Sequence, residues 1–216
     1  MIQILLLPFL LSFVTVAEAY NPSVVEPVRP YEVLVVAQEP EVTQEYLGAL
    51  LDFPEMYETS SEEPFLLTVA VKQLVTETPV SFSLIAIRQN DVGGGVTEVF
   101  RKNQPVGDWT VEKNSVLGLT FLVSDTVEAR VEPGTYRVEI STPINEGDYM
   151  LVLGNQLNPS GYFAMLGHIR TTQAHFGYSW LRMLYSSYVY YPLGSIVLLL
   201  LIFKTWQRRK KISHAT

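Results

Sequence analysis

The chain has 216 residues, of which 48% are hydrophobic and 12% aromatic; its formal net charge is −7, and it contains no cysteine. The lack of cysteine excludes a disulfide scaffold, a thiolate zinc site, a cysteine nucleophile and an iron–sulfur cluster. The acidic balance argues against a nucleic-acid-binding protein, which needs a basic surface. The apolar content is also too high for a disordered chain.

Residues 1–19 are predicted to form a secretory signal peptide. An apolar run from Ile4 to Val16 is followed by Ala17-Glu18-Ala19, whose small residues fit cleavage after Ala19. The run is shorter than the ~20 residues that a membrane span needs. Because no Lys or Arg precedes it, a short uncleaved anchor is the alternative.

Residues 20–154 are predicted to form an extracytoplasmic domain with an antiparallel β-sandwich or jelly-roll fold. Apolar and polar side chains alternate along segments such as 65–72 and 135–141, which is typical of half-buried strands. Turn residues such as Gly93-Gly94-Gly95 and Pro133-Gly134 separate these segments. The pattern predicts about nine short strands between Tyr31 and Gly154, and no helix among them.

Three stretches resemble known sequences. The segments 133–140 and 146–154, with Pro-Gly-Thr-Tyr in the first and Gly-Asp-Tyr in the second, are similar to the closing hairpin of bacterial pre-peptidase C-terminal-type β-sandwiches. The segment 40–69 resembles the opening of uncharacterised bacterial single-pass surface proteins. These motifs are structural, so the resemblance implies a jelly-roll-like, non-catalytic extracytoplasmic domain and carries over no active-site residue.

Residues 155–183 are predicted to contain a juxtamembrane amphipathic helix that begins after Asn158-Pro159-Ser160. Its expected apolar face repeats at three- and four-residue steps and comprises Tyr162, Phe163, Leu166, Ile169, Gln173 and Phe176. The helix would either lie in the outer membrane interface or pack on the sandwich as a stalk.

Two histidines, His168 and His175, lie on this predicted helix. They are two turns apart, which is ~10.5 Å of rise. That separation is too large for both to ligate one metal ion at ~2 Å. We therefore expect them to be polar residues at an interface.

Residues 184–204 are predicted to form one transmembrane helix, and residues 205–216 a basic cytoplasmic tail. The span is almost free of charge, with Tyr185 to Tyr191 at one end and Trp206 just beyond the other, as aromatic residues at the two membrane interfaces would be. Lys204 and the run 208–211 carry five positive charges, and no acidic residue follows Asp148. The positive-inside rule then predicts a single-pass type I protein of the plasma membrane, with its N-terminal domain outside.

No catalytic, cofactor-binding or metal-ligating residue is assigned from the sequence, and no cofactor is expected. The chain has no G-x-S-x-G elbow, and Gly93-Gly94-Gly95 lacks the Lys-Ser/Thr of a phosphate-binding loop. Carboxylate pairs that glycosidase chemistry could use are Glu62-Glu63, Glu55/Glu58 and Asp125/Glu128, and we expect them to be solvated. Oxygen-rich turns that could bind calcium are Asn145, Glu146 and Asp148, and Asn90-Asp91, but turn formation alone explains them.

Three functions follow in order of preference. The first is a non-enzymatic, membrane-anchored cell-surface module that binds a protein, glycan or envelope partner; it contacts membrane lipid through its helix and basic tail and does not bind nucleic acid. The second is an accessory subunit of a membrane protein complex, and the third a carboxylate-dependent envelope hydrolase. Trp109, Tyr57 and Tyr46 could form a binding patch, but we expect most of them to pack in the core.

Overall fold

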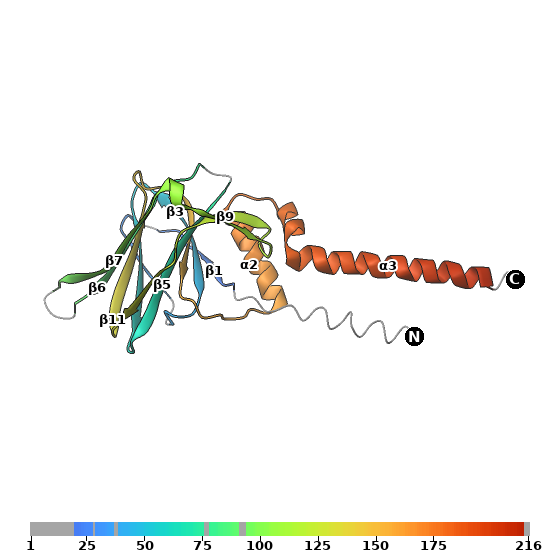
Figure 1. Cartoon of the computed structure of the whole chain (residues 1–216), viewed down its shortest axis with the longest axis horizontal. Helices are drawn as coiled ribbons and strands as arrows, with labels where there is room; N and C mark the ends of the chain where they lie inside the picture. The colour runs from blue at the N-terminus through green and yellow to red at the C-terminus, as the bar shows by residue number, and fades with distance from the viewer. Residues whose placement is uncertain (1–19, 28, 37–38, 76–77, 91–93, 214–216) are drawn as a thin grey trace.

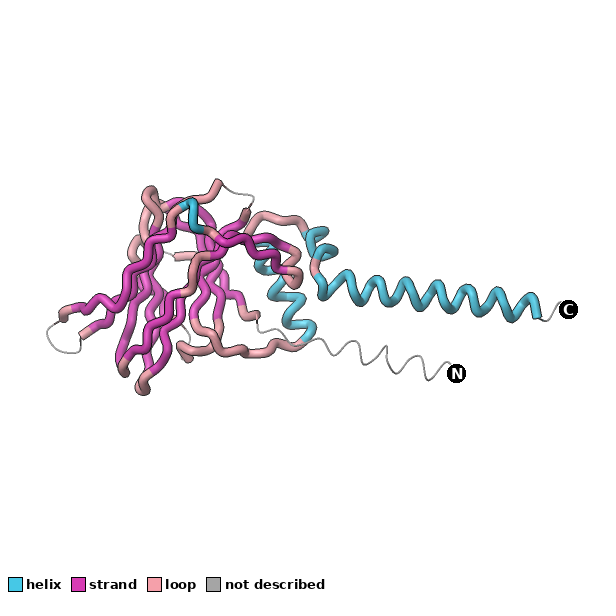
Figure 2. The backbone as a smooth tube through the Cα atoms, viewed as in Figure 1, coloured by secondary structure: helices cyan, strands magenta, loops and turns pink. Residues whose placement is uncertain are grey.

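Two stacked β-sheets form the body of the protein, as predicted, and a long helix leaves it (Figure 1). The computed structural model describes residues 20–27, 29–36, 39–75, 78–90 and 94–213, with the backbone alone for 208–213. The predicted signal peptide, 1–19, lies outside the described residues. Apart from one short turn, η1 (Val106–Asp108), the helices follow the last strand (Figure 2).

The larger sheet, which we call sheet A, has seven strands. Its order is β1-β3-β12-β5-β9-β8, and β10 pairs with β5 beside β9. The strands are β1 (Pro22–Val24), β3 (Gln44–Leu51), β5 (Phe65–Leu74), β8 (Thr110–Asn114), β9 (Leu119–Val123), β10 (Val127–Val131) and β12 (Glu146–Leu153).

The smaller sheet, sheet B, has five strands in the order β2-β4-β11-β6-β7. They are β2 (Val33–Val35), β4 (Glu55–Ser61), β6 (Phe82–Gln89), β7 (Val96–Gln104) and β11 (Gly134–Ser141). The edge strands β1 and β2 each pair in parallel with their neighbour, so both sheets are mixed rather than purely antiparallel.

The predicted closing hairpin is wrong. β11 pairs with β4 and β6 in sheet B, whereas β12 pairs with β3 and β5 in sheet A. The turn at Thr142–Asn145 therefore crosses from one sheet to the other. Alternating side chains bury one face of each strand in either arrangement, so the local pattern does not distinguish a hairpin from a crossing.

The main core lies between the two sheets. It contains the inward side chains of every long strand, including the fully buried rings of Tyr57, Tyr136, Tyr149 and Phe82. Each apolar side chain buried in this way contributes about 1.5–3 kcal/mol. Because the chain has no disulfide, this packing and the two ladders hold the sandwich together.

The second core lies on the outer face of sheet A, where α2 (Tyr162–His175) packs. Leu47, Leu74 and Met150 point outward from the sheet and meet Met165 and Ile169 of the helix. Sheet A is thus buried on both faces, and Figure 1 shows the three layers side by side. The packed stalk, one of the two arrangements left open by the sequence, is the one observed.

The buried side of α2 matches the predicted one in part, because Ile169, Gln173 and Phe176 of the predicted face are buried. Met165, Ile169, Thr172 and Gln173 are fully buried, whereas Phe163 is 85% exposed. The Gln173 amide donates a hydrogen bond of 2.7 Å to the Leu117 carbonyl, so a polar residue anchors the helix to the β8–β9 turn. Aromatic content therefore misled the prediction, because Phe163 belongs to the exposed side.

A short 3₁₀ helix, η2 (Trp180–Tyr185), and α3 (Ser187–Ser213) complete the chain. Residues Ser187–Gln207 are long and apolar enough to cross a membrane, and the 18-residue stretch that decides this has a mean hydropathy of 1.6 and is not buried. This segment overlaps the predicted span, and α3 extends well away from the sandwich (Figure 1).

Hydrogen bonds fix the base of α3 to the sandwich. Ser186 Oγ donates to the Val116 carbonyl, and the Ser187 N–H donates to the Ser115 carbonyl over 2.9 Å. Gly118, at a φ of +64°, lets the β8–β9 turn approach the backbone of Tyr185, where an added Cβ would lie 2.8 Å from the carbonyl carbon. The joint between domain and helix is therefore packed rather than a free linker.

Replacing Ser186→Ala is expected to lower the free energy of unfolding by about 1 kcal/mol, because the buried Val116 carbonyl loses its side-chain donor. The measurement is urea unfolding of the detergent-solubilised chain, followed by tryptophan fluorescence. Ser179→Ala is the matched control, since Ser179 is exposed and makes no side-chain capping bond. Equal effects of the two substitutions would mean that the hydrogen bond from Ser186 to Val116 does not stabilise the joint between the sandwich and α3.

Candidate ligand-binding groove

An open groove of about 410 Å³ lies at one end of sheet B, on the layer opposite α2. Its wall comes from the start of β6, the end of β7 and the end of β11. The lining residues are Ser81, Phe82, Ser83, Asn103, Gln104, Pro105, Ser141, Thr142 and Pro143. Six of the nine side chains carry a hydroxyl or amide group, and none of the nine is charged.

Strand register assembles the groove. Ser83 on β6 lies opposite Asn103 on β7 and opposite Ser141 on β11. Since Phe82 and Leu84 face the core, Ser83 faces outward, and its Oγ donates a hydrogen bond of 3.0 Å to Asn103 Oδ1. Three outward polar side chains, far apart in the sequence, thus form one row.

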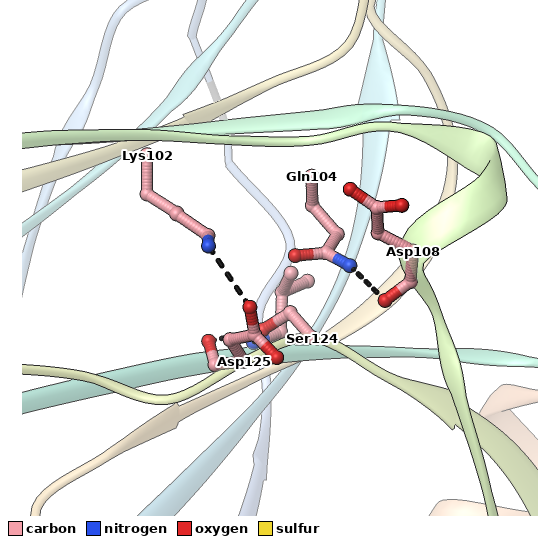
Figure 3. A network of polar contacts seen from close by, with 6 residues as sticks. Lys102, Gln104, Asp108, Ser124 and Asp125 are labelled. Carbon is pink, nitrogen blue, oxygen red and sulfur yellow. Dashed lines mark hydrogen bonds and ion pairs between the residues drawn. The ribbon is translucent and has the colours of Figure 1, made fainter.

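Gln104 follows Asn103 on β7, so its side chain points inward beneath the groove and is only 1% exposed. Its Nε2 donates a hydrogen bond of 2.6 Å to the Asp108 carbonyl, as Figure 3 shows. Its Oε1 is buried and has no partner within the described part of the chain. A buried acceptor left without a donor costs about 1–3 kcal/mol, so this oxygen is a local cost to the stability of the fold.

Trp109 packs against the main core next to Phe82, a residue of the groove lining. Its ring packs edge-on against Phe82 with centroids 6.0 Å apart, and its Nε1 is a second buried polar atom without a partner among the described residues. Tyr57 and Tyr46 are buried in the main core and Trp109 packs against it, which confirms the core interpretation of these three aromatics.

An ion pair closes the sandwich beside the groove. Lys102 Nζ lies 3.0 Å from Asp125 Oδ2, linking β7 of sheet B to the connection that follows β9 of sheet A (Figure 3). Ser124 precedes this aspartate and completes the edge of β5, because its Oγ accepts from the Val71 N–H at 3.0 Å and its own N–H donates to the Val71 carbonyl at 2.9 Å. The charge of Lys102 is therefore neutralised by a carboxylate across the two sheets.

The predicted carboxylate pairs do not form a two-acid site. Glu55 and Glu58 are three residues apart on β4, so they lie on opposite faces of sheet B. Glu58 is paired with Arg137 over 2.8 Å, and Asp125 with Lys102. Glu62 and Glu63 are exposed in the turn before β5.

A shallow acidic depression near that turn includes Glu39, Glu41 and Glu63. Both carboxylate oxygens of Glu41 already accept hydrogen bonds, one from the Leu66 N–H at 2.9 Å and one from Gln156 Nε2 at 2.6 Å. Glu41 therefore fastens the start of β5 to the segment after β12, and its role is structural.

The two oxygen-rich turns are held by protein groups. Asn145 Oδ1 accepts from the Thr142 N–H at 3.3 Å, and Thr142 Oγ1 accepts from the Glu146 N–H at 3.1 Å. Asn90 Oδ1 accepts from Thr97 Oγ1 at 3.3 Å, while Asp91 lies outside the described residues. Among the described residues, no group of three or more His, Asp or Glu side chains is arranged to hold a metal ion.

The two histidines have separate surroundings. His168 Nδ1 forms a hydrogen bond of 2.7 Å with the Tyr20 carbonyl. His175 packs edge-on against Phe176, and burial lowers the pKa of its imidazole while Asp148 opposes that shift. They do not converge on one ligand, as their spacing predicts.

One carboxyl group of the predicted pairs, that of Glu55, is buried between the sheets, so the expectation that it is solvated is wrong. Glu55 is 1% exposed; its Oε2 accepts hydrogen bonds from Tyr149 and, at 3.2 Å, from Tyr57, while its Oε1 has no partner in the described chain. Burial raises the pKa of Glu55, and the two tyrosine donors oppose that shift. The signal was its two-residue spacing from Tyr57, which places both on the inward face of β4.

Comparison with known proteins adds the fold alone. No protein-family model matches the sequence, and no match was found among curated proteins. The pre-peptidase C-terminal domain of a collagenase from Bacillus anthracis is 15% identical, with a TM-score of 0.36 over 59% of this chain and 98% of that chain.

Two further structures are similar at the same level. The Yersinia pseudotuberculosis-derived mitogen is 14% identical, with a TM-score of 0.38 over 55% of this chain and 89% of that chain. The CBM35 from Cellvibrio japonicus Abf62 is 16% identical, with a TM-score of 0.27 over 50% and 70% of the two chains. Likenesses this low carry no conclusion about activity or ligand.

Proposed function

We propose that the chain is a non-enzymatic, membrane-anchored β-sandwich module that binds a neutral, hydroxyl-rich ligand such as a glycan outside the cell. The observation that carries the proposal is the groove at the end of sheet B, whose lining side chains are uncharged and whose outward row of Ser83, Asn103 and Ser141 offers hydroxyl and amide groups. A sugar hydroxyl can donate to and accept from these outward groups, and it brings no charge that the groove would leave unpaired.

The outward orientation is supported by the sequence at both ends. The apolar run and Ala17-Glu18-Ala19 fit an exported domain, and the basic residues 208–211 fit a cytoplasmic tail. Because the natural chain has no cysteine, single cysteines report topology cleanly. A membrane-impermeant maleimide should label Gly107→Cys on intact cells and should label Ala215→Cys only after permeabilisation; the reverse pattern would contradict the orientation.

Binding through the groove is tested by Asn103→Ala. We expect this substitution to weaken binding of the full-length chain to neutral glycans about tenfold, because one side-chain hydrogen bond to a ligand contributes about 1.4 kcal/mol. Array binding in detergent identifies a glycan, and titration with that glycan gives the affinity.

Asn90→Ala is the matched control. Asn90 and Asn103 are both exposed, lie at opposite ends of the β6–β7 pair, and each accept one hydroxyl hydrogen bond. Equal affinities for the two variants, or no binding of the wild-type chain to any neutral glycan, would exclude the groove as a glycan site.

The second candidate, an accessory subunit of a membrane complex, is favoured by the packed joint. A module that only needs tethering would work on a flexible linker, whereas bonds from Ser186 and Ser187 fix the direction of the helix relative to the sandwich. Partners that co-purify with the full chain, and that are lost when only 187–207 is replaced by an unrelated span, would support this alternative.

A further inference from the structure

A second pocket, of about 400 Å³, lies where the sandwich meets the base of α3. Its floor is the β8–β9 hairpin, and its other wall is η2 with the first turn of α3. The polar groups that line it are Lys113, Ser115 and Thr120 from the hairpin, and Arg182, Tyr185 and Tyr190 from the helical side. It therefore combines two cationic side chains, two hydroxyls and two phenols.

The two cations of this pocket have no acidic partner. Every ion pair found among the described residues involves other bases, and the neighbouring Glu112 is paired with Lys72 over 3.3 Å. Since Glu112 and Lys113 are adjacent on a strand, their side chains point to opposite faces. Two unpaired cations in one pocket are notable in a chain with 22 acidic and 15 basic residues.

Arg182 is held in place by aromatic rings. Its guanidinium carbon lies 4.8 Å from the ring centroid of Tyr178 and 4.9 Å from that of Tyr185. Its Nε is buried and has no hydrogen-bond partner in the described part of the chain. The rings thus fix the guanidinium while leaving its N–H donors for another group.

The pocket lies at the depth of lipid headgroups. The candidate membrane span begins at Ser187, and Tyr190 is three residues further, which is ~4.5 Å along the helix. The 21 residues of this span form a helix long enough to cross the ~30 Å of a bilayer's hydrocarbon core. Exposed aromatic side chains surround this level, namely Trp180, Tyr185 and Tyr191.

We infer that this pocket binds the phosphate of an anionic phospholipid in the leaflet next to the sandwich. Arginine and lysine with hydroxyl donors match a phosphate, and their position at the membrane surface identifies a lipid as its source. The inference rests on the membrane anchorage proposed above. It is separate from the basic tail, which lies at the other end of the span.

The test measures lipid retained by the full-length chain. Arg208, Arg209, Lys210 and Lys211 are first changed to Gln, so that the tail contributes no binding. The purified protein is then mixed in detergent with phosphatidylglycerol or phosphatidylcholine, and native mass spectrometry counts the bound lipid. We expect phosphatidylglycerol to be preferred, and Lys113→Gln and Arg182→Gln each to lower its retention about fivefold.

Arg130→Gln is the control, because Arg130 is an exposed base on β10 outside the pocket lining. Arg182→Lys should retain part of the preference, since it keeps the charge. Lys113 is exposed on β8, so Lys113→Gln tests the pocket even where Arg182→Gln disturbs packing.

Two outcomes would overturn the inference. One is equal retention of phosphatidylglycerol by Lys113→Gln and Arg130→Gln. The other is complete displacement of the lipid by excess inorganic phosphate, which would make the pocket a site for free phosphate. Failure of the anchorage itself is measured independently, as release of the wild-type chain from membranes by alkaline carbonate without detergent.

Discussion

Gly48→Ala is expected to destabilise the sandwich by about 3 kcal/mol, because the core has no space for the added methyl group. A Cβ at this position of β3 would lie 2.5 Å from Tyr149 Oη, 2.6 Å from its Cζ and 2.9 Å from Glu55 Oε2. Tyr149 cannot turn away easily, since it is fully buried and hydrogen-bonded to both Glu55 and Tyr57. Urea unfolding of the detergent-solubilised chain, followed by tryptophan fluorescence, measures the loss.

Gly107→Ala is the matched control for this substitution. A Cβ on Gly107, in η1, meets nothing within 4 Å, and we expect a change of less than about 0.5 kcal/mol. If Gly48→Ala unfolded at the same urea concentration as Gly107→Ala, the close packing of Gly48 against the tyrosine pair would be refuted.

The elements of this fold were largely predictable from sequence because they depend on local patterns. Alternation of apolar residues marks strands such as β5 and β11, and a long uncharged run marks α3. The orientation of strands relative to one another is a different matter. Thr142–Asn145 connects two sheets, yet its turn residues would equally suit a hairpin.

The groove could not be predicted from sequence, because its residues become neighbours only through strand register. Ser83, Asn103 and Ser141 each occupy an ordinary outward position on a strand. Gln104 reads as one more polar residue at a strand end, and its burial depends on the chain turning through η1 directly after it. Polar residues of this kind carry no motif, so only the tertiary structure identifies them.

The same limit applies to the side chains of the second core. Thr172 and Gln173 are polar, yet α2 buries both because each has a partner on the sandwich side: Tyr20 Oη for Thr172 and the Leu117 carbonyl for Gln173. The three- and four-residue repeat does place Gln173 on the buried face, but it identifies neither the burial of Thr172 nor the backbone carbonyl on which the Gln173 amide docks. Sheet A is covered by α2, so a stable soluble fragment should extend through α2 rather than end at Gly154.

The protonation of Glu55 should make the stability of the sandwich depend on pH. Burial raises its pKa in the folded chain above the ordinary value of 4.5. The native state therefore favours the protonated form, so this contribution to stability is complete below pH 4.5 and is lost as pH rises through the higher folded pKa. Glu55→Gln removes the titration, and the variant should gain stability relative to the wild-type chain between pH 4.5 and neutral.

Two other buried groups must be separated from this effect. Burial also raises the pKa of Glu45, which contributes in the same direction. Burial lowers the pKa of His175 below 6.5, so its contribution has the opposite sign: it grows as pH rises towards 6.5 and is complete above that value. Subtracting the unfolding free energies of Glu55→Gln from those of the wild-type chain at each pH cancels both, because both variants retain Glu45 and His175.

Tyr149→Phe tests the hydrogen bond that the Tyr149 phenol donates to the Glu55 carboxyl group. Loss of the phenol removes one of two donors to the Glu55 carboxyl group and should cost about 1–3 kcal/mol at neutral pH, with a smaller cost under acid, where the carboxyl group is protonated. The pKa of Glu55 should rise further, since the hydrogen bond that lowers it is gone. A penalty for Tyr149→Phe that stays constant from pH 4.5 to neutral would mean that Glu55 does not titrate in the folded chain over this range.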